Sequence, residues 1–546
     1  MLPAVLPQWV NGPTSTRPNR STTTGSGLAA TRRSRWATSG QGDYDIVTGQ
    51  CFVGIDVGLT AAKAVAFDSS GREIGTQTTP NPRAAVGAGV QEVDMNALWD
   101  GVTSALVALS GVLTTQGYSV AAVGVTGHGN GIYLVDDQLE PVRPGIPSTD
   151  SRCESLLASL DPDKVALMQR ATGSQPWSAQ TGVLLKWLAD NEPGVVENTR
   201  WVMLCKDWIT AKLTGQASSE VSDFSAAGLL DLRSEEVSSE ALDAIGLDRS
   251  LTEKIPPLFH PDDIVGHVSA TAAGRSHLPE GTPVVAGSID VVAAPIGAGS
   301  TGSRDVTIIS GTWGINSVVH QLGPTSPDVT LNALFTKPGH VLAQEDAPTS
   351  MGNLEWLRGI LAGFGLTGIS TKDIVELAMG SQPGARGLLY LPFVYGAPRR
   401  PGASGTLVGF LAHHEAGDIA RAFLEGITLF HRLQVESLRG AGVQLTSTPW
   451  TLAGGGARSP EWAQIFADVM NQPVKLQTEP ELGARGVALM GASATGNTDV
   501  ASWVSVDSAG AQTITPGINT ARYAELREEF RSVLELLGGW WSNRAH

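Results

Sequence analysis

A strand–turn–strand pattern occurs twice in this chain and constrains its fold more than any other feature. In the first copy, the apolar segments 52–56 and 61–67 flank a turn at Gly58, which is typical of a β-hairpin. The second copy spans 306–319 and has Gly311 in the place of Gly58. Two such copies predict that the chain contains a repeated structural unit.

Each hairpin is followed, farther along the chain, by a strand that runs into glycines. Segment 120–126 leads into Gly127–Gly131, and segment 449–453 leads into Gly454-Gly455-Gly456. Because these elements come in the same order in both halves, we expect a duplicated α/β unit with a cleft between its copies.

Length and composition narrow the class of protein. A chain of 546 residues is long enough for two or more domains, and we place them at residues 50–298 and 299–546. Its 37 Lys and Arg residues against 53 Asp and Glu residues give a net charge of -16, the reverse of a nucleic-acid binder. No apolar run reaches the length of a membrane span. The three cysteines, Cys51, Cys153 and Cys205, offer no disulfide framework, so we expect a reducing cytoplasm.

Residues 1–49 differ from the rest of the chain. The first 42 residues contain twelve Ser or Thr residues, five Arg residues and no acidic residue. This composition also fits an organelle transit peptide. We expect instead a disordered leader or a mis-assigned start, because regular patterning begins only near Phe52.

Helical periodicity appears between the strands. Asp94 is the expected cap of a helix that continues through Leu106, and Gly440 is the expected end of a long helix that starts at Ala416. Further helices are expected at 182–190 and 205–213, and a buried strand at 283–289.

The first hairpin carries polar residues where an apolar strand ends. A carboxylate at such a position, Asp56, is costly unless it is paired or bound to a metal, and Mg2+ with its waters is a natural partner. Gly58 lets backbone approach a phosphate, Thr60 can donate a hydroxyl hydrogen, and Lys63 can reach a phosphate. The alternative is a plain hairpin turn with a surface Asp56 and a solvated Lys63, and this motif alone leaves both open.

Two further glycine-containing segments could contact a nucleotide. The turn Ser310–Gly314 offers amide and hydroxyl groups to phosphate oxygens, but taken alone it is more simply a structural turn with a buried Trp313. The glycines 454–456 precede a helix expected to have Ser459 as its cap and Pro460 at its first position. A glycine run there favours contact between backbone and a nucleotide.

Asp290 lies where the expected strand 283–289 meets a helix. An aspartate at such a junction is often only a helix cap, and by itself the residue favours that interpretation. The functional interpretation is a general base that takes a proton from a substrate hydroxyl.

Taken together, these segments resemble those of the FGGY carbohydrate kinases. The resemblance covers about residues 50–535 and rests on Asp56, Gly127–Gly131, Asp290, Ser310–Gly314 and Ala453–Trp462, in this order and spacing. The chain is similar to the xylulokinase branch, in particular to L-xylulokinase-like members. That likeness rests on Gly287–Val292, Gly352–Trp356 and Leu391–Gly396.

The resemblance implies an α/β fold of two actin/hexokinase/Hsp70-like (ribonuclease H-like) domains around a central cleft. The sugar would bind mainly to the first domain and the nucleotide mainly to the second. Asp290 would be the catalytic base, and Asp56 would organise Mg2+ and the transferred phosphate. Together with Lys63, the residues expected to contact ATP are Gly58, Thr60, Gly311, Thr312, Gly455, Gly456 and Arg458. The residues expected to contact the sugar are His128, Gly129, Asn130, Asp150 and Arg152.

Three positions depart from the family's usual pattern. Leu59 replaces a hydroxyl residue in the first hairpin, and Gly129-Asn130 stands where D-xylulokinases often have a Met-His pair. The segment Pro147–Arg152 lacks the usual Trp before its Asp. The last two departures concern the choice of sugar and leave phosphoryl transfer unaffected.

We therefore predict an ATP- and Mg2+-dependent kinase for a hydroxyl of a small sugar, a ketopentose such as xylulose. A polyol kinase with an erythritol-type substrate is the alternative within this class. An actin- or chaperone-like ATP-binding protein and, more weakly, a nucleotide-dependent dehydrogenase stay open from other classes. We expect a cytoplasmic protein with no nucleic-acid or membrane partner, and a homodimer stays open.

Overall fold

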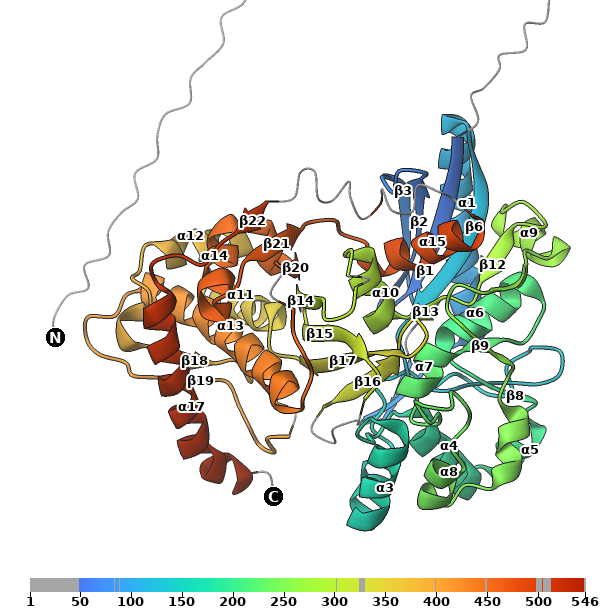
Figure 1. The fold of residues 1–546 in the computed structure, drawn as a ribbon, viewed down its shortest axis with the longest axis horizontal. Helices are drawn as coiled ribbons and strands as arrows, with labels where there is room; N and C mark the ends of the chain where they lie inside the picture. The colour runs from blue at the N-terminus through green and yellow to red at the C-terminus, as the bar shows by residue number, and fades with distance from the viewer. Residues whose placement is uncertain are drawn as a thin grey trace, which may run out of the picture. The chain divides into compact units, whose positions relative to one another are not determined.

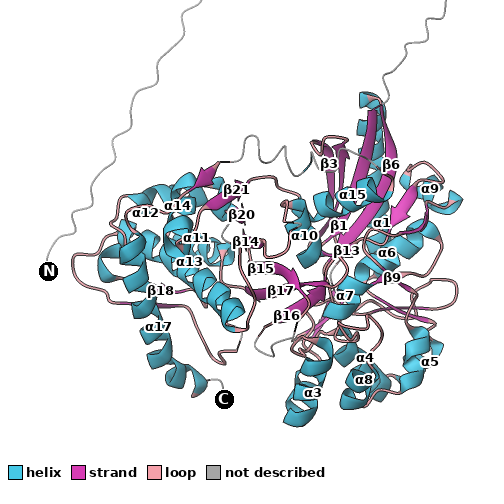
Figure 2. Cartoon of the chain, viewed as in Figure 1, coloured by secondary structure: helices cyan, strands magenta, loops and turns pink. Residues whose placement is uncertain are grey.

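The computed structural model describes residues 49–544, except for 83, 88, 301, 324–328, 398, 447–448, 497–502 and 504–511. The expected leader lies outside the described residues, apart from Gly49, which begins the first strand. The described part contains two seven-stranded sheets, one in each half of the chain, with helices packed around them (Figure 1, Figure 2).

The first sheet is mixed. Its strands are β1 Gly49–Val57, β2 Ala61–Asp68, β3 Glu73–Pro80, β6 Tyr118–Gly127, β11 Ile264–His267, β12 Pro283–Val285 and β13 Ser288–Ile289. They follow the order β11-β12-β6-β1-β2-β3, and β13 also pairs with β6. Strand β1 is antiparallel to β2 and parallel to β6, so the first expected hairpin is confirmed.

The second sheet repeats this arrangement. Its strands are β14 Val306–Ser310, β15 Gly314–Gln321, β16 Leu331–Leu334, β17 His340–Ala347, β20 Trp450–Gly454, β21 Val474–Gln477 and β22 Thr513–Ile514. Their order is β16-β17-β15-β14-β20-β21-β22. Strand β14 is antiparallel to β15 and parallel to β20, as β1 is to β2 and β6. The second hairpin and the repeated unit are thus confirmed.

Helices cover both sheets and fill the connections between strands. In the first half they are α1 Met95–Gln116, α2 Glu154–Ser159, α3 Pro162–Thr172, α4 Thr181–Asn191, α5 Pro193–Asn198, α6 Cys205–Thr214, α7 Val221–Ala226, α8 Ser239–Ile245, α9 Ala270–Ser276 and α10 Asp290–Gly297. In the second half they are α11 Met351–Gly363, α12 Thr371–Met379, α13 Ala416–Gly440, α14 Pro460–Met470, α15 Leu482–Ala494 and α17 Thr520–Ser542. Short strand pairs are β4 Ala84–Gly87 with β5 Val90–Glu92, β7 Tyr133–Val135 with β8 Trp201–Met203, β9 Ser219–Glu220 with β10 Leu258–Phe259, and β18 Leu389–Leu391 with β19 Thr406–Val408.

Helix α1 packs against β2 and β3. Its cap is the expected one, because the Asp94 carboxylate accepts a hydrogen bond from the backbone of Ala97 at 3.0 Å. Leu98, Val102 and Leu106 of α1 are buried in the core of the first half. By length and composition α1 is apolar enough to cross a membrane, so the expectation that no segment reaches that length is wrong. The core helix of a soluble protein meets the same criterion, and α1 has such a packed face.

The core of the second half lies between its sheet and helices α13, α14 and α17. Helix α13 begins where expected, but Gly440 is its last residue and the chain turns at Gly442, which has a φ of 89°. The expected helices at 182–190 and 205–213 are α4 and α6. The expected strand at 283–289 is interrupted at Gly287, which has a φ of 72° and separates β12 from β13.

Helix α15 comes from the second half of the sequence but packs on β1, β6 and α10 of the first half. Figure 1 shows this red helix beside the blue strands. A Cβ atom on Gly54 would lie 1.9 Å from the carbonyl oxygen of Ala484, and one on Gly124 would lie 2.3 Å from that of Val487. Glycine at these two strand positions therefore permits the close approach of the helix.

Candidate active site

Asp56 is the next-to-last residue of β1 and lies opposite Lys63 in the first hairpin. The turn is closed by the amide of Gly58, which donates to the carbonyl oxygen of Ala61 at 3.1 Å. Burial raises the pKa of Asp56 to about 6, while Lys63 opposes this rise and Glu481 adds to it. A carboxylate held in this way gains stability when a cation binds it.

Lys63 already has a partner across the molecule. Its Nζ lies 2.7 Å from Oε2 of Glu481, the residue just before α15, and the two side chains are 34% and 15% exposed. Thr60, in the same turn, is exposed and Gly58 is half-buried. Contact of Gly58, Thr60 and Lys63 with phosphate stays a prediction. To bind a phosphate, the Lys63 ammonium group would have to leave the Glu481 carboxylate.

Asp290 lies at the same edge of the first sheet as Asp56. Strands β1, β6 and β13 are parallel neighbours, with Asp56 beside Thr126 and Thr126 beside Ser288. Helix α10 starts at Asp290 itself, whose carboxylate accepts a hydrogen bond from the next amide, that of Val291, at 2.7 Å, and from no other group among the described residues. Asp290 is therefore not a conventional helix cap.

The environment of Asp290 favours its protonated form. Burial is the main cause and repulsion from Asp56 the second, and together they raise the pKa of Asp290 to about 7. A carboxyl group with a pKa near the operating pH is well suited to accept a proton. The role of Asp290 as a general base stays a prediction, and a pKa of about 7 is compatible with it.

Asp346, on β17, is a candidate that the sequence analysis missed. It adds to the repulsion that raises the pKa of Asp290, so this carboxylate of the second sheet lies near the first sheet's edge. Its own pKa rises to about 6, mainly through burial, although a 2.8 Å hydrogen bond from Gln344 opposes the rise. Acidic residues are rare in strands, so Glu345-Asp346 was the signal in the sequence.

The donor atoms at Asp56 fit a magnesium ion. Mg2+ in kinases takes one or two carboxylates, several waters and the phosphates of the nucleotide. Asp56 offers one such carboxylate, close to the N-terminus of α15, where a Cβ on Gly483 would lie 3.0 Å from Asp56 Oδ2. In the described part of the chain, no group of three or more His, Cys, Asp or Glu residues is placed to hold a metal ion.

The turn of the second hairpin is held from below. The amide of Gly311 donates to the carbonyl oxygen of Trp313 at 3.1 Å. The carbonyl oxygens of Gly311 and Thr312 accept hydrogen bonds from Met351 and Gly352 at the start of α11, at 2.8 and 3.3 Å. Trp313 is 51% exposed, so the alternative of a turn around a buried tryptophan is wrong.

The glycine loop after β20 packs directly on this hairpin. Gly454 has a φ of 79°, and a Cβ on it would lie 2.5 Å from the carbonyl oxygen of Ser310. Gly455 and Gly456 belong to a short 3-10 helix that ends at Arg458, which is exposed. As expected, the Ser459 hydroxyl caps α14 by accepting from Trp462 at 3.2 Å, with Pro460 at the first position. The carboxyl ends of β14 and β20 thus bring Gly311, Thr312, Gly455 and Gly456 together.

The segment after β6 lies beside the first hairpin. His128 is buried, with Nε2 3.0 Å from the hydroxyl oxygen of Tyr133, and burial lowers the pKa of His128 to about 4. Gly129 leaves no room for a side chain, since a Cβ there would lie 2.0 Å from Cδ1 of Ile289. Asn130 has a φ of 60°, and its buried Oδ1 accepts no hydrogen bond from the residues that the structure describes, which leaves an acceptor for a ligand hydroxyl.

Asp150 and Arg152 mainly satisfy each other. The Asp150 carboxylate accepts hydrogen bonds from the backbone of Gln91 at 2.7 Å and from the backbone and Nε of Arg152, both at 2.9 Å. Their side chains are 0% and 5% exposed. Contact with a sugar stays a prediction for both residues, because their polar atoms already have partners within the protein.

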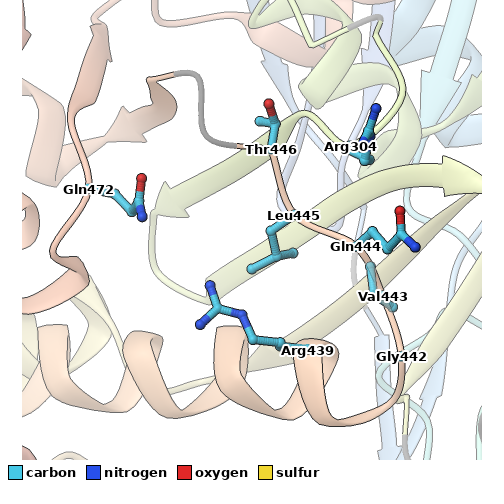
Figure 3. Close-up of a pocket in the computed structure, with 8 residues that line it drawn as sticks. All are labelled: Arg304, Arg439, Gly442, Val443, Gln444, Leu445, Thr446 and Gln472. Carbon is cyan, nitrogen blue, oxygen red and sulfur yellow. The ribbon is translucent and has the colours of Figure 1, made fainter.

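A cavity of about 540 Å³ lies away from these residues. It is lined by Arg304, Arg439, Thr446 and Gln472, at the end of the second sheet where β14, β20 and β21 begin. Figure 3 shows that the guanidinium groups of Arg304 and Arg439 point in different directions. They do not converge on one ligand position, and the predicted site lies at the opposite ends of β14 and β20.

Comparison with known proteins places the chain among sugar kinases. The FGGY family of carbohydrate kinases matches with its N-terminal domain at residues 51–297 and with its C-terminal domain at residues 306–495. The chain is 29% identical over 456 residues to the L-xylulose/3-keto-L-gulonate kinase of Escherichia coli (strain K12), covering 82% of this chain and 89% of that one. It is 27% identical over 525 residues to the erythritol kinase of Brucella abortus (strain 2308), covering 91% and 98%.

Solved structures give the same result for the fold. The crystal structure of xylulose kinase from Rhodospirillum rubrum superposes with a TM-score of 0.79 at 26% identity, covering 90% of this chain and 100% of that one. The expected two-domain α/β fold of the actin/hexokinase type is thereby confirmed.

Proposed function

Because the chain belongs to the FGGY family of carbohydrate kinases and is an ATP-dependent sugar kinase, we propose that it phosphorylates a ketopentose such as xylulose with Asp290 as general base. The observation that carries this proposal is the position of Asp290. Its carboxyl group lies at the carboxyl edge of β1, β6 and β13, where repulsion from Asp56 helps to raise its pKa to about 7.

In the proposed reaction, the substrate hydroxyl gives its proton to Asp290. The hydroxyl oxygen then forms a bond to the γ-phosphorus of ATP, and the bond between that phosphorus and the β–γ bridging oxygen breaks, which releases ADP. Mg2+, held through Asp56, would neutralise charge on the phosphates. Backbone amides of the second hairpin and the glycine loop would position the phosphates of ATP.

The sugar is proposed to bind beside the first hairpin. Asn130 supports this assignment through its buried, unpartnered Oδ1, and Gly129 supports it by keeping the backbone free of a side chain. Asp346 could accept a hydrogen bond from a further hydroxyl of the substrate. An erythritol-type polyol is the second candidate, favoured by the match to erythritol kinase over 91% of the chain.

We also propose a cytoplasmic location. Cys51, Cys153 and Cys205 are all free and buried, which suits a reducing compartment.

The test is a coupled assay of ADP release with MgATP across ketopentoses, aldopentoses, ketohexoses and small polyols. A rate with one substrate that is lost in Asp290→Asn would support the kinase and identify its sugar. Equal ADP release with and without every sugar, from protein that binds ATP, would contradict the proposal.

A further inference from the structure

Five uncharged polar side chains form a continuous, buried hydrogen-bond network next to the second hairpin. Ser310 Oγ lies 3.0 Å from Ser350 Oγ, which lies 3.2 Å from His431 Nε2. On its other side, His431 Nδ1 lies 2.9 Å from Asn316 Oδ1, and Asn316 Nδ2 lies 2.9 Å from Gln434 Oε1. All five side chains are buried, with at most 6% of any residue exposed.

The donor and acceptor roles in this hydrogen-bond network follow from the chemistry of the five groups. An amide oxygen can only accept, so His431 Nδ1 must donate to Asn316 Oδ1. Nε2 is then without hydrogen and accepts from the Ser350 hydroxyl, and Ser350 in turn accepts from the Ser310 hydroxyl. Burial lowers the pKa of His431 to about 3, so the imidazole stays neutral and these roles persist at physiological pH.

Ser310 is the point at which three parts of the nucleotide-facing surface meet. It pairs with Gly314 to close the hairpin. The glycine loop packs on it, because a Cβ on Gly456 would lie 3.1 Å from Ser310 Cβ. Ser350 directly precedes α11, whose first two amides hold the hairpin's turn. A shift of either serine would therefore move the hairpin, the glycine loop and the start of α11 relative to one another.

His431 connects this meeting point to the long helix α13. Its ring fits against the hairpin so closely that a Cβ on Gly314 would lie 2.9 Å from Cε1. The His431 ring also packs against the ring of Phe466 in α14, edge-on at 5.5 Å between centroids. The imidazole is thus fixed by two hydrogen bonds and by packing, and it has no freedom to turn.

We propose that His431 is a positioning residue for the nucleotide: through Ser350 and Ser310 it fixes the second hairpin and the glycine loop in the arrangement that binds ATP. This inference rests on the proposed function, because it takes these two segments as the ATP-binding surface. It assigns to His431 no contact with ATP and no part in proton transfer.

The test measures binding of ATP and ADP to the full chain by calorimetry, without any sugar, in three variants of His431. His431→Leu removes both hydrogen bonds, and we expect the Kd for both nucleotides to rise about tenfold. In His431→Gln, the amide oxygen can replace Nε2 and accept from Ser350, so we expect a rise of about threefold at most. His431→Asn keeps only the donor to Asn316, so we expect it to behave like His431→Leu.

Thr103→Val is the matched control. It removes a buried hydroxyl group of α1, which donates to the carbonyl oxygen of Trp99 at 3.1 Å and does not belong to the hydrogen-bond network. Its nucleotide affinity should equal that of the unaltered protein, whatever happens to its Tm. A purely structural role for His431 predicts that affinity follows Tm in all variants, without the difference between Gln and Asn.

Two results would contradict the inference alone: an unchanged Kd in folded His431→Leu, or equal Kd values for His431→Gln and His431→Asn. If His431→Leu does not fold, Ser350→Ala replaces it, with the same expected rise and the same contradiction by an unchanged Kd. Failure of the unaltered protein to bind ATP or ADP would instead overturn the proposed function itself.

Discussion

The two hairpins of this molecule share their connections but differ in what lies around them. Strands β1 and β14 are each antiparallel to the next strand and parallel to a later one. At the sheet edge where β1 and β13 end, the carboxyl groups of Asp56 and Asp290 have raised pKa values. At the end of β14, the polar groups from Ser310 to Gln434 are uncharged and satisfy one another.

This difference teaches that one backbone arrangement can serve two chemical tasks. At the first edge, where Asp56 and Asp290 lie, burial makes the ionised carboxylates unfavourable in free energy. Binding of a cation or acceptance of a proton offsets this cost. The second edge holds the neutral side chains from Ser310 to Gln434, and we expect its backbone amides to contact phosphates. Changes at the first edge should therefore alter turnover, and changes at the second edge should alter nucleotide affinity.

The largest effect is expected from Asp290→Asn. An amide cannot accept the substrate proton, so kcat should fall about 10²- to 10⁴-fold, while the Kd for ATP stays within about twofold. Steady-state kinetics and calorimetry measure the two quantities. A variant with kcat within about threefold of the unaltered enzyme would show that proton acceptance lies elsewhere.

Asp56→Asn should reduce kcat about 10²-fold, because the loss of its charge weakens the binding of Mg2+ at the transferred phosphate. The dependence of the rate on Mg2+ should shift to higher concentrations. Ser310→Ala is the matched change at the second edge and should leave the Mg2+ dependence unaltered. If both variants shift it equally, the division of tasks between the two edges is wrong.

The pH dependence separates the two edges in the unaltered protein. Asp290 accepts a proton only when ionised, so with its pKa at about 7, kcat/KM should rise about tenfold from pH 6 to pH 8 and level off above. The pKa of His431 is about 3, so this group should add no change in nucleotide affinity over that range. A flat kcat/KM profile at saturating Mg2+ would contradict the assignment of Asp290.

Gly454→Ala should have the smallest effect of the four and affect the second edge alone. Its Cβ would lie 2.5 Å from Ser310 O, so the loop must move, and we expect KM for ATP to rise about fivefold with the sugar KM unchanged. Gly442→Ala is the control, since Gly442 has a similar φ of 89° and no atom within 4 Å of the added Cβ. Both should lose stability from backbone strain, and Gly454→Ala should lose more, because its φ of 79° with a ψ of -153° lies in a region that is essentially restricted to glycine. Equal KM values in the two variants would mean that strain, not the contact, sets affinity.

The elements that the sequence predicted are those with local signals. Glycine in the turn and flanking apolar segments predict both hairpins. Capping residues predict the starts of α1 and α14 at Asp94 and Ser459, and helical periodicity predicts α13. The position of Asp290 could be predicted in the same way, since it follows a buried strand directly. Its proximity to Asp56 depends on the pairing of β1, β6 and β13, which the repeated pattern only suggested.

What the sequence could not predict depends on contacts between distant segments. Asp346 approaches Asp290 only because β17 pairs with β15, and Lys63 finds Glu481 only because the chain returns to the first sheet at α15. The hydrogen-bond network of five side chains joins residues up to 124 positions apart in the sequence, from Ser310 to Gln434. None of the segments that contribute to it has a distinctive composition. Trp313 was misjudged because apolar residues are usually buried, whereas this turn holds it outside the core.

The return of α15 to the first sheet has a consequence for how the protein is made. β1 and β6 leave the ribosome long before Leu482–Ala494 have been added. The face of the first sheet around Gly54 and Gly124, which α15 covers in the folded protein, therefore stays exposed while most of the chain is synthesised. Exposed apolar surface of this kind is what chaperones bind and what leads nascent chains to aggregate. The half of the protein that leaves the ribosome first is therefore completed only when nearly all of the chain has been translated.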